Sequence, residues 1–202
     1  MPSDVEIEAD ITALRDGFYK LTRKIGQFNI LDEKLVPEGL KPHTRSISWL
    51  AEQVIKQQAR LNLTEIGFVS VVDASSDIEQ YDCIVNVNGR EVLINLKVTA
   101  AKSQKGSRND INKAYKLFKI FQKNKDTLLY YVIFKIKFKN TNIIFSDKDV
   151  IVFYVPWINE VYVNPSNHHL QANYEEPMHK RSVDDFLDLV DKEITIKKIP
   201  RK

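Results

Sequence analysis

An aspartate, an asparagine and a lysine surround one short predicted hairpin in this sequence. Asp82 precedes the first apolar run of the hairpin, and Asn95 and Lys97 close the second. Carboxylate and amide oxygens bind hard cations such as Mg²⁺, which neutralise the charge that grows on a phosphorane, while a lysine can orient or activate the attacking water. These residue types are typical of metal-dependent phosphodiester hydrolysis, and the main-chain carbonyl of Leu96 is an additional candidate ligand.

The turn between the two runs determines how the three residues face one another. The pair Asn88-Gly89 predicts a two-residue type I′ turn, because both central residues need positive φ. Counting back from this turn brings Asp82 directly opposite Asn95, where Cβ atoms lie about 4.5–5.5 Å apart. Lys97 follows two residues later, so it is expected to project from the same face of its strand.

Asn95 brings no negative charge to such a site, so another carboxylate is needed to complete it. Glu52 is a candidate, because it borders the apolar stripe of a predicted amphipathic helix over residues 45–61. The alternative is a solvated helix glutamate with no catalytic role. Asp77 and Glu79 precede Asp82 in a turn-like segment, where such residues usually serve turn chemistry, and are reserve candidates.

The trio around the hairpin also has a purely structural interpretation. An aspartate opposite an asparagine is often a polar edge pair, and Lys97 would then be an exposed strand lysine. The alternate residues from Val92 to Val98 are apolar, so the face of Asn95 and Lys97 is expected to lie against solvent or a cleft. This placement favours the functional interpretation.

Over roughly residues 82–118 the chain resembles the PD-(D/E)XK nuclease motif, in the order acid, hairpin, x-Leu-Lys-x-Thr, polar loop and helix. It is most similar there to type II restriction endonucleases of the EcoRV and HincII kind. The resemblance implies an α/β fold with a restriction-endonuclease-like core, in which a mixed central β-sheet carries the active-site hairpin and is flanked by α-helices. It also implies Asp82 and Asn95 as Mg²⁺ ligands, Lys97 as the water-positioning group and Glu52 as an auxiliary acid.

Two positions depart from that motif. Tyr81 stands where the motif has proline, which the family tolerates, and Asn95 replaces the middle acid. Some restriction enzymes of this superfamily carry asparagine there, and an engineered acid-to-amide change would give the same sequence. The alternative functions are a PD-(D/E)XK nuclease that reads DNA structure, as in repair or junction cutting, and a DNA-binding protein weakened catalytically at Asn95.

The residues after the motif are of the types that contact DNA. Arg reads guanine, Gln and Asn read adenine, and Lys and Ser suit phosphate oxygens. Basic residues far outnumber acidic ones between Lys97 and Lys139, which predicts a basic surface, although a solvated helix face explains part of this excess. The candidate DNA contacts, in this loop and in a second polar loop where turn chemistry is the alternative, are Lys102, Ser103, Gln104, Lys105, Ser107, Arg108, Asn109, Asn167, His168 and Gln171.

Other patterns predict the elements around the hairpin. An amphipathic helix is expected over about 11–25, a strand near Thr64–Val72, and a helix over about 110–124 for which Asn109 is an alternative N-cap. Two further strands are expected in 127–139 and 149–157, and a last helix opens at Ser182 with a capping-box pattern. His168 and His169 are adjacent, so they point to opposite sides of an extended chain and make a poor metal pair.

Length and composition suit one domain over residues 1–202, with 43% hydrophobic residues. Within it we expect an N-terminal helical region over about 5–40, a catalytic core over about 45–160, and a C-terminal DNA-contact loop, helix and basic tail over about 161–202. No apolar run approaches the roughly 20 residues of a membrane span. There is no secretory pattern, no Gly-rich phosphate loop for a nucleotide cofactor and only one cysteine, so the prokaryotic cytoplasm is the expected location.

Together, the residues and the resemblance predict a Mg²⁺-dependent type II restriction endonuclease that hydrolyses double-stranded DNA at a short sequence. The net charge of +3 is too small to indicate nucleic acid by itself. By resemblance the enzyme is a homodimer with its interface in residues 5–40, because a palindromic site is matched by a symmetric pair of active sites.

Overall fold

The computed structural model describes residues 2–29, 44–76, 78–100, 108–139 and 141–201, without the side chains of 44–46 and 146–149. Along the chain its elements are α1 (Asp4–Ile25), β1 (Gln27–Asn29), α2 (Thr44–Leu61), α3 (Leu63–Ile66), β2 (Ser70–Asp73), β3 (Cys83–Val87), β4 (Arg90–Ala100), β5 (Asn109–Lys113), α4 (Ala114–Lys123), β6 (Leu129–Lys139), β7 (Asn142–Tyr154), the 3-10 turn η2 (Val155–Trp157), β8 (Tyr162–Val163), β9 (His169–Ala172) and α5 (Val183–Ile196).

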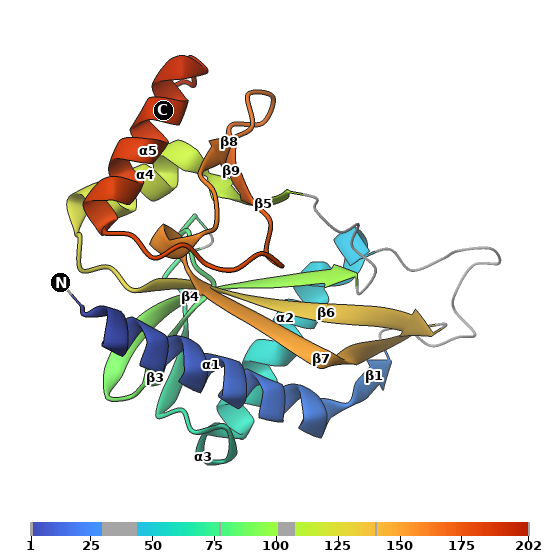
Figure 1. Ribbon diagram of the computed structural model, residues 1–202. Helices are drawn as coiled ribbons and strands as arrows, with labels where there is room; N and C mark the ends of the chain where they lie inside the picture. Colours follow the sequence, from blue (N-terminus) through green and yellow to red (C-terminus); the bar gives the residue numbers. More distant parts are fainter. Residues whose placement is uncertain (1, 30–43, 77, 101–107, 140, 202) are drawn as a thin grey trace.

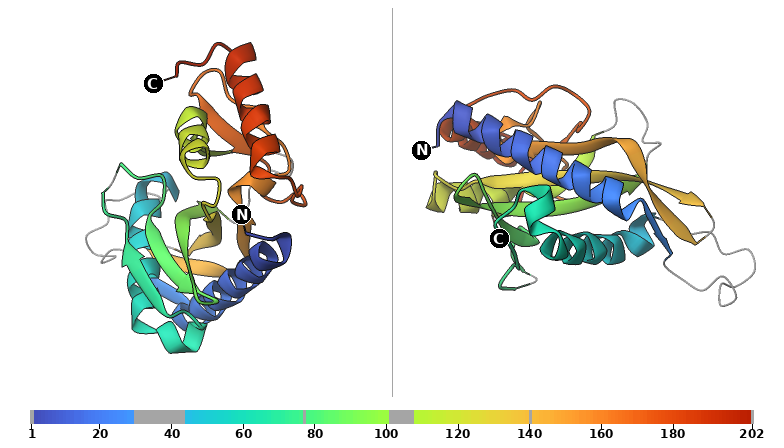
Figure 2. Two further views of the ribbon diagram at one scale, coloured as in Figure 1. Left: turned by 90° about the vertical axis from the view of Figure 1, so that its left-hand side faces the viewer. Right: turned by 90° about the horizontal axis from the view of Figure 1, so that it is seen from below.

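A six-stranded mixed sheet forms the middle of the molecule, in the order β1-β7-β6-β4-β3-β2. Only β4 and β6 run parallel among the described pairs, because β5 and α4 form the crossover between them. Helices α1, α2 and α3 lie on one side of the sheet, and α4, α5 and the small sheet β5-β9-β8 lie on the other (Figures 1 and 2). The predicted α/β class, with a mixed sheet flanked by helices, is confirmed.

Helix α1 forms where its sequence pattern predicts it. Ser3 and Glu6 make a capping box at its start, and its apolar stripe is buried against the sheet. Phe18 from this stripe makes edge contacts with Phe68 and with Phe134 of β6, with ring centroids 5.1 and 5.5 Å apart. The helix therefore supports the side of the sheet opposite α4.

The hairpin of β3 and β4 has the predicted geometry. Asn88 and Gly89 have φ values of 52° and 76°, so both turn residues have the positive φ that a type I′ turn requires. Pairing runs from the turn back to Cys83–Ile94, which confirms the register counted from the sequence. The turn and the register of β3 against β4 thus follow from the local conformation of Asn88 and Gly89.

Two elements differ from their predictions around the hairpin. The predicted strand Thr64–Val72 is wrong over its first half, because α3 ends at Gly67 in the left-handed conformation, with φ 78°, and β2 begins only at Ser70. The helix predicted over 110–124 starts at Ala114 instead.

The residues before α4 form strand β5, which pairs with β9 from a distant part of the chain. Asn109 lies in this strand and Lys113 is the N-cap residue, so the alternative of Asn109 as N-cap is wrong. Tertiary pairing here overrides a local helix pattern. Strand β7 also begins earlier than predicted, at Asn142, and Val155–Trp157 forms a 3-10 turn around Pro156 in place of a strand end.

A continuous set of buried apolar side chains joins both helical layers to the sheet, from Ile7 in α1 to Ile194 in α5. Of the predicted N-terminal region over about 5–40, residues 30–40 lie outside the described residues. Within the described part of the chain, no helix is both long and apolar enough to cross a bilayer.

Candidate active site

Asp82 is held at the mouth of the hairpin by two main-chain groups of β4. Its N–H donates to the carbonyl of Ile94 over 2.7 Å, and its carboxylate Oδ2 accepts the N–H of Leu96 over 2.7 Å. The two bonds flank Asn95, so Asp82 lies across the hairpin from that residue. The carboxylate thus has a defined position without any contribution from a ligand.

The turn at the other end of the hairpin is anchored on α1. Asp10 is fully buried and accepts Nδ2 of Asn88 over 3.0 Å and Nη2 of Arg90 over 2.9 Å. The hydroxyl of Tyr130 donates to the other carboxylate oxygen of Asp10 over 3.2 Å. Arg90 also pairs with Glu6 at the surface. This network fixes the hairpin that carries the candidate site to helix α1.

Asn95 is buried, with 5% of its surface exposed. Its Nδ2 donates to the main-chain carbonyl of Gln80 over 3.2 Å, so Oδ1 is the other end of the amide. That oxygen is buried and has no hydrogen-bond partner among the described residues. Since buried polar atoms normally have partners, Oδ1 suits a ligand role toward a water or a hard cation.

The sequence predicts that the face of Asn95 lies against solvent or a cleft. At Asn95 this face is buried and does not lie against solvent. Asn95 is paired with Tyr131 of β6, which is fully buried and donates its hydroxyl to the carbonyl of Ile111 in β5 over 3.2 Å. The small sheet therefore covers this part of β4. Lys97 lies further along the strand and is only half-buried.

Helix α2 brings Glu52 to the cleft that Asp82 lines. Glu52 and Asp82 line one cleft of about 550 Å³, whose wall is formed by Trp49, Glu52, Gln53, Lys56, Asp73, Ala74, Ser76, Glu79, Tyr81 and Asp82. Burial raises the pKa of Glu52 to about 7; the Asp82 charge raises it too, whereas the charges of Lys97 and Lys56 lower it. Glu52 is thus no fully solvated helix glutamate, and it is within electrostatic reach of both Asp82 and Lys97.

The pKa of Asp82 is also raised by burial and lowered by neighbouring groups. Burial raises the pKa of its carboxyl, while the hydrogen bond from Leu96 and the charges of Lys97 and Lys56 lower it. Two carboxyl groups that resist ionisation in one cleft are a suitable environment for a cation, because an added positive charge favours the ionised form of both.

The donor set fits a hard cation with oxygen ligands. Asp82 and Glu52 offer carboxylates, Asn95 offers a buried, unpartnered amide oxygen, and the carbonyl of Leu96 stays a candidate. The described residues contain no group of three His, Cys, Asp or Glu side chains that could hold a metal. His168 has a positive φ of 62° in a tight turn, in line with the turn chemistry considered for that loop.

Sequence patterns alone did not single out Lys56 and Asp73. Both line the cleft, and Nζ of Lys56 lies 2.8 Å from Oδ1 of Asp73. The helical spacing of four residues between Glu52 and Lys56 was a usable signal, since it places both on one face of α2. Glu79, a reserve candidate, also lines the cleft, whereas Asp77 lies outside the described residues.

The candidate DNA contacts fall into two groups. Lys102, Ser103, Gln104, Lys105 and Ser107 lie outside the described residues. Arg108 forms two hydrogen bonds with Glu160, of 2.6 and 2.8 Å, and its guanidinium stacks 4.1 Å from the ring centre of Tyr162. The Nε and Nη2 donors of Arg108 thus bind another side chain of the protein.

The second polar loop is organised by Asp110 of β5. Asn167 donates to one oxygen of this carboxylate over 3.0 Å and Gln171 to the other over 2.5 Å. Asn109 lies beside Asp110 in β5, and His168 lies in the turn between β8 and β9. The structure therefore gathers Asn109, Asn167, His168 and Gln171 around the small sheet, away from the hairpin turn.

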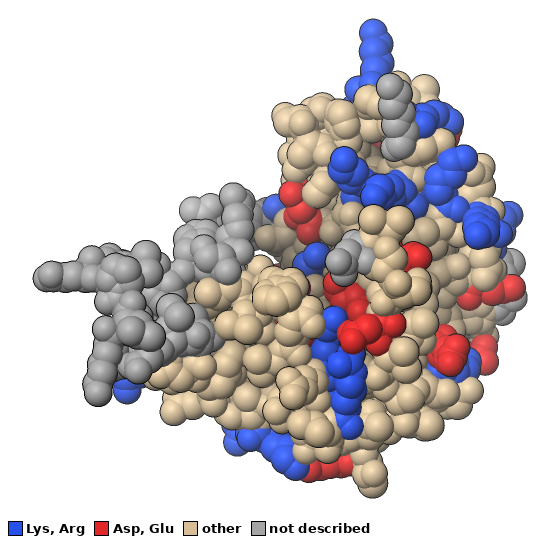
Figure 3. All heavy atoms as spheres, turned by 180° about the vertical axis from the view of Figure 1, so that it is seen from behind, with Lys and Arg blue, Asp and Glu red and all other residues tan. Residues whose placement is uncertain are grey.

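Basic side chains gather over the part of the molecule that carries α4 and α5, and acidic and basic side chains adjoin one another in the middle of the same view (Figure 3). Lys116, Lys119 and Lys123 belong to α4.

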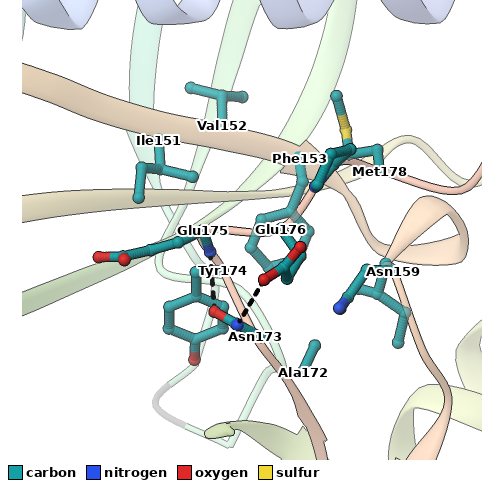
Figure 4. Close-up of a pocket in the computed structure, with 12 residues that line it drawn as sticks. Ile151, Val152, Phe153, Asn159, Ala172, Asn173, Tyr174, Glu175, Glu176 and Met178 are labelled. Carbon is teal, nitrogen blue, oxygen red and sulfur yellow. Dashed lines mark hydrogen bonds between the residues drawn. The ribbon is translucent and has the colours of Figure 1, made fainter. Parts of the chain in front are cut away.

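A second cavity lies beside β7 and contains none of the candidate catalytic residues. It measures about 250 Å³ and is lined by Phe153, Asn159, Tyr174 and Met178, among others. Asn173 extends between Glu175 and Glu176 and bonds to both (Figure 4). The cleft beside α2, where Glu52 and Asp82 meet, is therefore the candidate active site.

Comparison with known proteins identifies the fold. No protein-family model matches the chain, and no curated protein matches its sequence. Among solved structures it is similar to one described as NlaIV restriction endonuclease, with a TM-score of 0.59 and 14% sequence identity, over 89% of this chain and 77% of that one. At this identity the likeness concerns the fold alone, and it shows that the chain has a restriction-endonuclease-like fold.

Proposed function

We propose that this protein is a Mg²⁺-dependent endonuclease that hydrolyses double-stranded DNA at a short sequence, as type II restriction endonucleases do. The observation that carries the proposal is the meeting of Glu52 from α2 and Asp82 from the hairpin in one cleft, with the charge of Lys97 acting on both. A fold similar to that of NlaIV restriction endonuclease supports it.

Each residue has a role in this proposal. Asp82 and Asn95 hold the cation, Asp82 with the oxygens left beside its bond to Leu96 and Asn95 with Oδ1. Glu52 supplies the second negative charge once it has lost its proton. When bound, Mg²⁺ supplies neutralisation of the charge that develops on the phosphate. Lys97 orients the attacking water and stabilises the anion that forms as the water loses a proton.

The proposed oligomeric state and the proposed subgroup of restriction endonuclease rest on the sequence resemblance. We propose a homodimer, whose two active sites act on the two strands of a symmetric site. We also propose that the specificity residues come from the small sheet and the loop before it, and that the EcoRV and HincII kind is the relevant subgroup. Asn167 and Gln171 would have to exchange Asp110 for a base edge on binding.

Digestion of plasmid DNA tests the proposal. With Mg²⁺ we expect discrete fragments, which disappear with chelator and fall at least about 10²-fold in Asp82→Ala and Lys97→Ala. Lys24→Met, which breaks a surface ion pair with Glu65, is the matched control and should cut normally. Smearing or branch-dependent cutting would indicate a nuclease that reads structure, and absence of cutting by the native chain would reject the proposal.

A DNA-binding protein with a weakened catalytic centre is the second candidate, because Asn95 lacks the acid of the motif. If the native chain binds DNA without cutting it, while Asn95→Asp cuts in a Lys97-dependent way, this second candidate replaces the first. The same outcome would explain the amide as an inactivating change.

A further inference from the structure

Helix α2 contributes a lysine, Lys56, to the wall of the cleft. Lys56 stands one helical turn after Glu52 in α2, and only 8% of its surface is exposed. Its side chain lines the same cleft as Glu52 and Asp82, and Nζ donates to Oδ1 of Asp73 over 2.8 Å. The buried stem and the ammonium at the cleft wall give this charge a defined position.

Asp73 does not depend on Lys56 for its charge partner. Nη2 of Arg60 lies 2.5 Å from the same oxygen, and both cations lower the pKa of the Asp73 carboxyl. An ammonium has three N–H donors, and in the described part of the chain Asp73 is the hydrogen-bond acceptor seen for Lys56. Lys56 can therefore turn to another anion while Arg60 keeps Asp73 paired.

The charges of the cleft indicate what that anion is. The two acids Glu52 and Asp82 would be balanced by one divalent cation, and Asn95 adds no charge. The other two acids of the wall, Asp73 and Glu79, are then outnumbered by Lys56, Arg60 and Lys97. One positive charge remains in excess, so the cleft attracts a group with negative charge and several acceptor oxygens. A phosphodiester meets both conditions, and lysine binds phosphate as a point charge.

We propose that Lys56 binds a non-bridging phosphate oxygen of the DNA backbone in this cleft, exchanging Asp73 for the phosphate when the substrate enters. The proposal rests on the proposed nuclease function and adds a substrate-binding lysine from α2 to the water-orienting Lys97 of the hairpin. Methionine has nearly the shape of the lysine stem, so Lys56→Met removes the charge and preserves the packing.

The test is the salt dependence of DNA binding, measured with Mg²⁺ in a Lys97→Ala background so that the duplex is not cut. Each phosphate neutralised contributes about 0.9 to the slope of log K against log salt. We expect Lys56→Met to lower this slope by about 0.9, whereas Lys56→Arg keeps it. The matched control is Lys24→Met, which removes a lysine paired with Glu65 far along α1 and should keep the slope.

Asp73→Asn tests the exchange itself. Removing the competing carboxylate should tighten DNA binding several-fold, because Lys56 no longer has to leave Asp73. In the otherwise native chain, Lys56→Met should slow cleavage at least about tenfold with an unchanged unfolding midpoint.

An unchanged slope in Lys56→Met, or weaker binding in Asp73→Asn, would overturn the role of Lys56 while leaving the nuclease proposal intact if the native chain still cuts DNA. A native chain that neither binds nor cuts duplex DNA would overturn both.

Discussion

At the level of single residues, the state of Asn95 is the most informative feature of the site. Its amide nitrogen donates a hydrogen bond to the carbonyl of Gln80, and its amide oxygen is buried without a partner among the described residues. A carboxylate at this position would place an oxygen against the carbonyl oxygen of Gln80. The local structure therefore suits an amide, even though the motif has an acid there.

This geometry predicts the effect of Asn95→Asp. We expect the variant to lose about 1–3 kcal/mol of stability in chelator at pH 8, because one hydrogen bond is replaced by a repulsive contact. Urea unfolding measures the loss, and Mg²⁺ should restore more stability to the variant than to the native chain. A variant as stable as the native chain in chelator would contradict the amide-specific role of Gln80.

Glu52 predicts a dependence of stability on pH. Its pKa of about 7 in the folded chain exceeds the ordinary value of 4.5, so the folded state holds the proton more tightly than the unfolded state does. Stability therefore falls as pH rises from about 4.5 to 7, and the loss is constant above that range. The half-buried position reduces the effect to about 1–2 kcal/mol.

Glu52→Gln removes this penalty. In chelator we expect it to exceed the native chain in stability by about 1–2 kcal/mol at pH 8 and to match it at pH 4. The exposed Glu91→Gln on β4 is the control and should change stability by less than about 0.5 kcal/mol at either pH. A constant difference between Glu52→Gln and the native chain across this range would show that Glu52 ionises normally.

At the level of elements, helix α1 positions the hairpin of the candidate site through the buried carboxylate of Asp10. We expect Asp10→Ala to cost about 3 kcal/mol, because it removes the buried acceptor shared by Asn88, Arg90 and Tyr130, of which only Arg90 keeps a second partner, Glu6. Glu6→Gln removes only the exposed arm of the same arginine, keeps the capping box and should cost less than about 1 kcal/mol. Equal losses, measured by urea unfolding, would contradict the anchoring role of Asp10.

The elements also separate what local pattern can predict from what it cannot. Asn88-Gly89 defines the turn and the register because the constraint lies in two adjacent backbones. Strand β5 was missed because its partner β9 lies about sixty residues further on, and a hydrogen-bonded partner outweighs a helix pattern over five residues.

At the level of the whole molecule, the predicted dimer must use a surface other than the apolar stripe of α1. That stripe is buried against the sheet within one chain, so the described part of the region 5–40 offers its polar side. We predict that the protein sediments as twice the monomer mass of 23.4 kDa. A single-monomer mass at all concentrations, with cutting retained, would contradict the symmetric assembly.

The sequence by itself determined the hairpin and its register, because these depend on residue type and on short-range backbone geometry. It also determined that Glu52 lies on an amphipathic helix. Only the tertiary structure decided that α2 brings Glu52 and Lys56 to the hairpin, that Asn95 is buried against Gln80, and that Arg108 is paired with Glu160. Those contacts join segments far apart in the chain, and their positions follow from how the layers pack on the sheet, which no local spacing encodes.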